Sequence, residues 1–307
     1  MSRSKPHLIT KRGISVSQRL RNLAAKEGRL HQQVLQRFGL EAAIRRIFAS
    51  DQADRFGLQT SLKGGALMFF AEGVSQLDGR TTTDIDLQLS GWTGTMEDLA
   101  AALRDALAVV PLEDDGVRFD LDDIKVLKTR DGGVPGGSVM LRAQAGSTEL
   151  KFKCDVGFYD PILRDTLIAV DYPSLLPDLP AIRIMRQPIE YSISDKCHAA
   201  WKHAGENTRL RDYYDLYVYL TKCTVDDDRL REAFARSWPM YGADVPASID
   251  GIAGYSAAFV AANAVTWRGL KDSSGWAVPV PELDEVVALI RSRLEPIFNS
   301  PAPRLTA

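Results

Sequence analysis

Two neighbouring stretches decide the fold of this chain: LKGGALMFF at residues 62–70 and GRTTTDIDLQL at residues 79–89. In the first, a short strand expected at Leu58–Leu62 runs through two glycines into an apolar helix start at Ala66–Ala71. Glycines between a strand and a helix let the backbone approach a ligand closely and direct N–H groups at an anion. The first stretch therefore predicts a turn that binds an anion.

The second stretch carries two carboxylates on one face of a strand. Apolar and polar residues alternate from position 84 to position 89, which is typical of a strand with one buried face. Asp84 and Asp86 therefore share a face and repel each other at close range. Divalent cations offset such repulsion in phosphoryl-transfer sites. Two aspartates spaced in this way, without other evidence, also occur on the solvated face of a strand. The glycine turn ahead of the strand favours the cation-binding interpretation.

A third carboxylate, Asp155, lies on a later strand pattern. In ELKFKCDVGF, residues 149–158, the apolar side chains fall on one face, and Lys151, Lys153 and Asp155 fall on the other. If this strand pairs with the one that carries Asp84 and Asp86, three carboxylates come together. The other interpretation is that Asp155 and the two lysines form a charged outer face, and the residues alone leave both open.

In the rest of the chain, helix and strand patterns alternate up to about residue 160, and the pattern is helical from about residue 190. Helices are expected over residues 15–49, where Gly28 and Gly39 are candidate breaks, and over 96–109. Further strands are expected over residues 118–127 and 138–143, with a loop at 131–137. Five prolines predict a connector over 160–190. The later helices are expected at residues 193–204, 211–220, 228–235, 257–264 and 283–293.

This order of elements predicts an α+β fold, with a mixed sheet and flanking helices followed by a helical domain. We expect three parts. Residues 1–50 would be a basic helical segment that packs on the core, residues 51–185 the α/β core, and residues 186–307 a C-terminal helical domain.

Composition narrows the class of protein and the kind of metal. The chain has 307 residues, of which 45% are hydrophobic, and no apolar run approaches the roughly 18 residues of a membrane span. The start, MSRSKPHLITKRG, lacks the apolar core of a secretion signal, so we expect a cytoplasmic protein. Three cysteines and four histidines show neither a disulfide framework nor zinc-site spacing. Metal chemistry would therefore depend on carboxylates, which favour Mg²⁺ or Mn²⁺.

The formal net charge of −2 hides an uneven distribution. Residues 1–50 hold eleven basic and two acidic side chains, a charge of +9, and the remainder sums to −11. A basic segment on an acidic body points to nucleic acid or another anion as a partner. The alternative is a solvated helix surface without a ligand.

Taken together, the two opening stretches resemble the core of nucleotidyltransferases of the polymerase-β superfamily. More narrowly, the chain resembles the AbiEii/AbiGii toxin family. The family pattern is an L-K-G-G segment, an Arg-x-Thr-x-Asp-x-Asp strand, a Lys-x-x-Ala helix and an Arg-x-Lys-Asp-x-x-Asp-Leu helix. The last two blocks are matched by KCHA at residues 196–199 and RLRDYYDL at residues 209–216. The chain departs from the pattern at Arg211, where lysine is frequent, and at Ala66, where a hydroxyl residue is frequent.

The resemblance implies a role for each matched residue. Nucleotide-binding residues would be Lys63, Gly64, Gly65, Arg80, Thr83 and Lys196, with the two glycines acting through backbone N–H groups. The metal ligands would be Asp84, Asp86 and Asp155, which would also be catalytic together with Lys196 and Asp212. Supporting roles are implied for Arg209, Arg211 and Asp215.

The residues themselves leave other interpretations open at several of these positions. Lys196 also fits a solvated helix position, with Ser192 and Ser194 as candidate caps of its helix. Asp212 and Asp215 also fit an Asp–Arg network, and Arg80 also fits a loop arginine that caps local structure. The tyrosines at positions 213, 214, 217 and 219 could stack on bases, but helical spacing favours core packing.

As to function, the resemblance implies a magnesium-dependent toxin that transfers a nucleoside monophosphate from an NTP to an acceptor hydroxyl. The implied acceptor is the 3′ end of tRNA or another RNA, the implied outcome is a block of translation, and a cognate antitoxin is the implied partner. Two alternatives stay open: an acceptor hydroxyl on a protein or small molecule, and a catalytically silent module that binds nucleotide.

Overall fold

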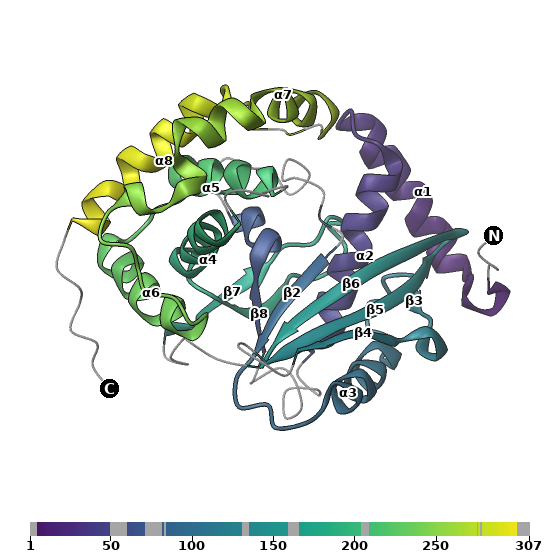
Figure 1. The fold of residues 1–307 in the computed structure, drawn as a ribbon. Helices are drawn as coiled ribbons and strands as arrows, with labels where there is room; N and C mark the ends of the chain where they lie inside the picture. Colours follow the sequence, from purple (N-terminus) through teal and green to yellow (C-terminus); the bar gives the residue numbers. More distant parts are fainter. Residues whose placement is uncertain are drawn as a thin grey trace. The chain divides into compact units, whose positions relative to one another are not determined.

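The computed structural model describes residues 5–49, 60–70, 82, 84–130, 135–158, 166–203, 209–274, 276 and 278–299. The chain forms two compact units (Figure 1). Unit 1 comprises Met1–Ala66 and Thr81–Arg186, and unit 2 comprises Leu67–Arg80 and Gln187–Ala307. In the described part of the chain, none of the helices has the length and apolar character needed to cross a membrane.

Unit 1 is built on an eight-stranded mixed sheet in the order β3-β5-β6-β2-β1-β8-β7, with β4 paired to β5. The pairs β2·β6 and β1·β8 are parallel, and the other pairs are antiparallel. The strands are β1 (Thr60–Lys63), β2 (Asp84–Leu89), β3 (Val117–Phe119), β4 (Lys125–Arg130), β5 (Gly136–Ala145), β6 (Thr148–Gly157), β7 (Ile168–Tyr172) and β8 (Ile182–Arg186).

The described part of unit 1 contains the α-helices α1 (Lys11–Lys26), α2 (His31–Ile47) and α3 (Met96–Ala108). Thr10 caps α1 by accepting a hydrogen bond from the Gly13 N–H, and Thr95 and Asp98 form a capping box on α3. Helix α2 packs on β6 (Figure 1) so closely that a Cβ at Gly39 would lie 2.4 Å from Cζ of Phe152. The expectation that Gly39 ends a helix is therefore wrong. Gly39 lies inside α2, where the absence of a side chain leaves room for the sheet. Gly28, at φ 63°, lies between α1 and α2.

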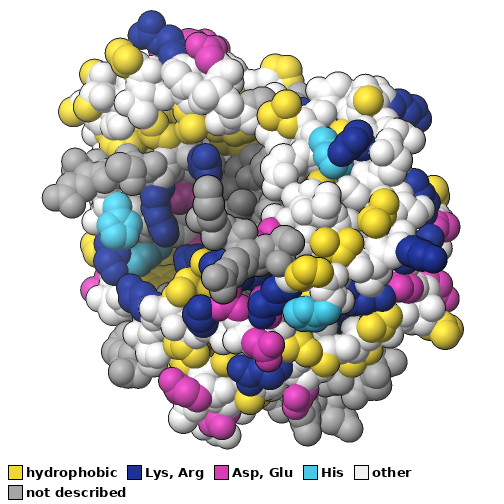
Figure 2. All heavy atoms as spheres, turned by 90° about the vertical axis from the view of Figure 1, so that its right-hand side faces the viewer, with side chains coloured by type: hydrophobic (Ala, Val, Ile, Leu, Met, Phe, Trp, Pro, Cys, Tyr) yellow, Lys and Arg dark blue, Asp and Glu magenta, His cyan; other side chains and the backbone are white. Residues whose placement is uncertain are grey.

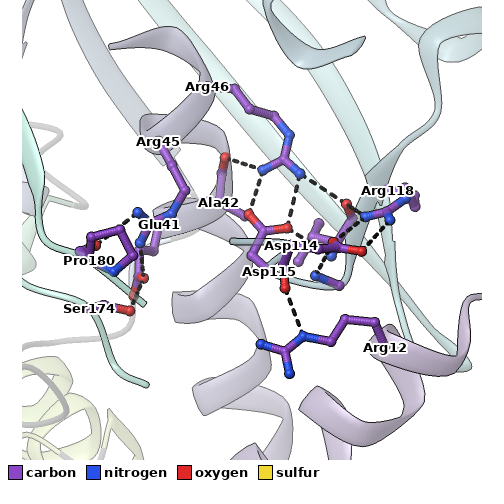
Figure 3. Close-up of polar contacts among 12 residues, drawn as sticks. Arg12, Glu41, Ala42, Arg45, Arg46, Asp114, Asp115, Arg118, Ser174 and Pro180 are labelled. Atoms are coloured by element: carbon purple, nitrogen blue, oxygen red, sulfur yellow. Dashed lines mark hydrogen bonds and ion pairs between the residues drawn. The ribbon is translucent and has the colours of Figure 1, made fainter. Parts of the chain in front are cut away.

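A buried ion pair and the hydrogen bonds of Glu41 join α2 to the rest of unit 1 (Figure 3). The Arg46 guanidinium donates to both carboxylate oxygens of Asp115, at 2.6 and 2.9 Å, and both side chains are 1% exposed. Glu41 accepts hydrogen bonds from Arg45, from the Ser174 hydroxyl and from the Leu175 N–H. Because each carboxylate is satisfied by several donors, these charges are tolerated in the interior.

Two expectations for the strands need correction. The proline-rich segment 160–190 is more than a connector, because β7 and β8 form an antiparallel pair within it and β8 pairs with β1. Its prolines at 173, 177, 180 and 188 lie outside these strands, which preserves the ladder hydrogen bonds. The strand expected over 118–127 is divided, because a 3₁₀ turn at Leu121–Asp123 separates β3 from β4.

Unit 2 is helical in its described part. Its helices are α4 (Ile189–Lys202), α5 (Leu210–Lys222), α6 (Asp227–Met240), α7 (Ala257–Ser274) and α8 (Leu283–Phe298), with 3₁₀ turns at Ile249–Gly251 and Ala253–Tyr255. All five expected helices are present. α4 starts at Ile189 after Pro188, so Ser192 and Ser194 are interior residues of α4 and not its caps.

The core of unit 2 is rich in aromatic side chains. Tyr213, Tyr214 and Tyr219 are at most 1% exposed and pack among Trp238 and Trp267, which confirms core packing for these tyrosines. The prediction of an α+β fold with a mixed sheet followed by helices is confirmed as well.

Candidate functional site

The carboxylate strand β2 lies between β1 and β6 in the sheet. Its register places Asp86 opposite Lys63 of β1 on one side and opposite Asp155 of β6 on the other. Asp84 lies opposite Lys153 of β6. Side chains at paired positions of a sheet share a face, so these five residues lie together. The strand pairing that would bring Asp155 beside Asp86 is therefore present.

The glycine turn is in direct contact with Asp86. Gly64 has φ 68°, and a Cβ added to it would lie 2.2 Å from Oδ2 of Asp86. Both the backbone conformation and the lack of space require glycine at this position. Gly64 and the buried Gly65 begin a 3₁₀ helix, Gly64–Phe70, in place of the expected α-helix start. Lys63, at the end of β1, is half-buried.

Asp155 is held by two neighbours. Its carboxylate accepts a hydrogen bond from the Ser138 hydroxyl on β5 and forms an ion pair of 2.5 Å with Nζ of Lys153. Burial by itself would lower the pKa of Lys153. The bond to Asp155 and the charges of Asp84 and Asp86 outweigh burial and raise that pKa. Lys153 is thus an ammonium in the field of all three carboxylates.

The carboxylates of Asp84 and Asp86 are suited to binding a divalent cation. Within the described ranges, no three side chains of the Asp, Glu, His or Cys types are arranged as a metal cage. Mg²⁺ is usually bound by one or two carboxylates plus substrate phosphates and water, so Asp84 and Asp86 offer a suitable donor set. Asp155 is engaged by Ser138 and Lys153, and its role as a third ligand stays a prediction.

A second cluster of expected site residues forms within unit 2. Nζ of Lys196 on α4 lies 2.7 Å from Oδ1 of Asp212 and 2.7 Å from Oδ2 of Asp215, both on α5. Lys196 is 9% exposed and Asp215 is 0% exposed, whereas the Asp212 side chain is 20% exposed. The interpretation of Lys196 as a solvated lysine is therefore wrong. A buried ammonium with two carboxylate partners holds a fixed position, and Asp212 is the partner that reaches solvent.

Four further residues were expected at the site, and only two of them lie within the described residues. Arg80 and Thr83 lie outside the described residues. Arg211 is exposed on α5, and the carbonyl oxygen of Arg209 accepts the Asp212 N–H at 2.8 Å. Two features of the site were not predicted from the sequence: the hydrogen bond from Ser138 to Asp155 and the ion pair of Lys153 with Asp155. The signal that could have found Ser138 is the pairing of two adjacent strand patterns, residues 138–143 and 149–158, as a hairpin.

At least six of the eleven basic residues in the N-terminal segment have partners within unit 1. Arg46 and Arg45 form the buried pairs of Figure 3, and Arg37 is 5% exposed with its guanidinium 4.8 Å from the Tyr172 ring centroid. Further pairs join Lys5 to Asp120 and both Arg12 and Arg19 to Asp178. On the face of the whole chain shown in Figure 2, Asp and Glu side chains are interspersed among the Lys and Arg side chains. The +9 charge of this segment is therefore a poor measure of the charge it offers a ligand.

A glycine turn in contact with a strand that carries two carboxylates, on a mixed sheet with flanking helices, is the arrangement expected of a nucleotidyltransferase. Residues 44–288 match the family described as nucleotidyl transferase AbiEii toxin, type IV toxin–antitoxin system. The chain belongs to this family and is a nucleotidyltransferase.

Two solved structures from Helicobacter pylori resemble the chain. The first is provisionally described as a nucleotidyltransferase, with 17% identity, a TM-score of 0.48, and coverage of 88% of this chain and 96% of that one. The second is JHP933, with 16% identity, a TM-score of 0.47, and coverage of 86% and 91%. No curated protein matches the chain.

Proposed function

We propose that this protein is a magnesium- or manganese-dependent toxin that transfers a nucleoside monophosphate from an NTP to the 3′ hydroxyl of tRNA and so blocks translation. The observation that carries the proposal is the contact between Gly64 and Asp86, with Asp155 in register beside Asp86. It supports an arrangement in which an anion-binding backbone, cation-binding carboxylates and a further carboxylate serve the same phosphate.

In this proposal Asp84 and Asp86 hold the divalent cation, which when bound would polarise the α-phosphate. The backbone N–H groups of Gly64 and Gly65 bind the triphosphate, as glycine turns at helix starts do for other anions. Arg80 and Thr83 are assigned to the nucleotide by the family pattern, as is Lys63.

The acceptor hydroxyl must lose its proton as it attacks, and we assign Asp155 to accept it. Ser138 and Lys153 fix the orientation of the Asp155 carboxylate, which favours a defined direction of attack. Lys153 also neutralises charge among the carboxylates when no cation is present.

We assign Lys196 to the phosphates of the nucleotide, where an ammonium would stabilise the pyrophosphate that leaves. Asp212 and Asp215 hold this ammonium at 2.7 Å each. The more exposed Asp212 is the one assigned to the catalytic step, and Asp215 is assigned to position Lys196. Arg209 and Arg211 are supporting residues in this proposal.

The test is incubation of the purified protein with labelled NTPs, Mg²⁺ and total tRNA. We expect label on RNA, with Asp86→Ala inactive and Asp122→Ala active, because Asp122 is an exposed carboxylate of the same unit away from β2. RNA that stays unlabelled by a protein that binds NTP would overturn the tRNA acceptor. Labelling by Asp86→Ala would overturn the site.

Two other functions give different results in the same experiment. With an acceptor hydroxyl on a protein or small molecule, label appears on that molecule and not on RNA. A silent nucleotide-binding module transfers no label but is stabilised by Mg²⁺ with NTP. Membership of a type IV toxin–antitoxin family supports a cognate antitoxin as partner, and co-expression with the neighbouring gene tests that part.

A further inference from the structure

The last turn of α4 presents an exposed tryptophan. Trp201 is 37% exposed, whereas Trp238 and Trp267 are 0% exposed and Trp92 and Trp276 are half-buried. All five tryptophans of the chain lie in the described ranges. Trp201 is thus the most exposed of the five, and an exposed tryptophan side chain offers an apolar ring to a ligand.

Other aromatic rings support Trp201 from the protein side. Its ring centroid lies 5.5 Å from that of His198 and 5.7 Å from that of Trp238. His198 in turn stacks on Tyr241 at 4.5 Å, and the Tyr241 hydroxyl donates to Asp195 at 2.8 Å. Burial lowers the pKa of His198 to about 4, so its ring is neutral at neutral pH. Trp201 therefore rests on a fixed, uncharged aromatic layer.

Two basic residues lie near this aromatic layer. Lys202 and His203 follow Trp201 in the chain, are exposed, and lie close enough to His198 to lower its pKa. A lysine next to an exposed ring is the combination that binds single-stranded nucleic acid, because the base stacks on the ring and its phosphate contacts the ammonium.

The size of the surface favours a base over a protein. Among the described residues of unit 2, the other exposed large apolar side chain is Val265, which lies on α7. A stable protein interface buries roughly 800 Å² on each partner, far more than one indole offers. A single nucleobase matches the area of one ring.

We propose that Trp201, with Lys202 and His203, is a stacking site for a nucleobase of single-stranded RNA. This proposal rests on the proposed function, in which RNA is the acceptor, and adds the residues that bind it.

The test measures binding of a short, fluorescently labelled single-stranded RNA by anisotropy, without NTP. We expect Trp201→Ala to weaken binding about tenfold and Trp201→Phe to preserve it within about twofold, because phenylalanine still stacks. Lys202→Ala should reduce the slope of log affinity against log salt by about 0.7, since one phosphate contact is lost. Arg293→Ala removes an exposed basic residue of α8 and should change neither quantity.

The outcomes separate this proposal from the proposed function. If Trp201→Ala binds RNA as the wild type does and labelling of RNA continues, the stacking site is wrong and the function stands. If Trp201→Ala weakens only the complex with the antitoxin, the surface contacts protein and the proposal is overturned. If the wild type binds no RNA, both the stacking site and the RNA acceptor fail. The stabilisation by NTP with Mg²⁺ should be the same in every variant, which shows that the fold is intact.

Discussion

Gly64 and Asp86 lie in contact across the pair β1·β2: a Cβ at Gly64 would be 2.2 Å from Oδ2 of Asp86. The backbone that turns out of β1 thus passes directly over a carboxylate that we assign to cation binding. An anion held by this turn would lie beside a cation held by Asp86. In the proposed function, this close contact links the two binding roles and makes both depend on glycine.

Gly64→Ala should abolish nucleotidyl transfer and lower the free energy of unfolding by more than the strain of a positive φ. Alanine at φ 68° costs about 1–2 kcal/mol, and its Cβ would also displace Asp86. Gly242→Ala is the matched control, because Gly242 has φ 69° and nothing within 4 Å of an added Cβ. Label transfer and urea unfolding measure both effects. Full activity in Gly64→Ala would contradict the assigned contact.

Lys153→Met should tighten binding of Mn²⁺ by roughly two- to fivefold, the range expected for one partly exposed charge interaction. The reason is that the Lys153 ammonium shares the field of Asp84, Asp86 and Asp155 and competes with a divalent cation. Lys151→Met removes a lysine from the same face of β6 two residues away and serves as control. Isothermal titration calorimetry with Mn²⁺ gives the affinities. Equal affinity in the wild type and Lys153→Met would show that the lysine does not compete.

Much of the carboxylate site could be predicted from local periodicity. The alternation around Asp86 and Asp155 gives each strand and the face of each carboxylate, because the period of a strand is two residues. The register between β2 and β6 could not be derived in this way, since these parallel strands are distant in sequence and no turn fixes their alignment. The partners of Asp155 do not depend on that register: Ser138 is paired with Asp155 in the β5·β6 hairpin, and Lys153 lies two residues before it on the same face of β6.

Charge and proline content were poorer guides. The N-terminal segment has a charge of +9, but a sequence does not show that Arg46 meets Asp115 in the interior. The prolines of residues 160–190 predicted a connector, but in the sequence they lie before, between and after β7 and β8 and not within these strands. In both cases tertiary contacts decide the outcome, and local composition does not contain them.

Asp215→Asn and Asp212→Asn should have different effects. Asp215 is fully buried against Lys196, so its loss leaves a buried ammonium with less compensation and should cost about 3 kcal/mol of stability. Asp212 is 20% exposed, so Asp212→Asn should reduce activity strongly with a smaller loss of stability. Thermal unfolding and label transfer, measured on both variants, separate positioning from catalysis. The reverse order of stabilities would refute these assignments.

Arg46→Ala should destabilise unit 1 by about 3–5 kcal/mol, because it leaves Asp115 buried without its partner. RNA binding by the fraction that stays folded should not change, since Arg46 is 1% exposed. Arg21→Ala is the control for the exposed part of the basic segment and should leave stability nearly unchanged. Urea unfolding and anisotropy with RNA measure the two properties. A specific loss of RNA affinity in Arg46→Ala would argue against the structural role.

Stability should fall as the pH drops from about 6.5 to about 4, and His198 should account for part of this loss. Burial lowers the pKa of His198 to about 4, below the value of about 6.5 in an unfolded chain. Between these two pH values the unfolded chain binds a proton that the folded chain does not, so acid favours unfolding, by at most about 3 kcal/mol. His198→Phe keeps a ring against Tyr241 and should flatten the dependence in this window. His7→Gln changes an exposed histidine of unit 1 and should keep the wild-type profile. The free energy of unfolding in urea, measured across this pH range, decides the matter, and a His198→Phe profile parallel to the wild type would exclude His198 as the cause.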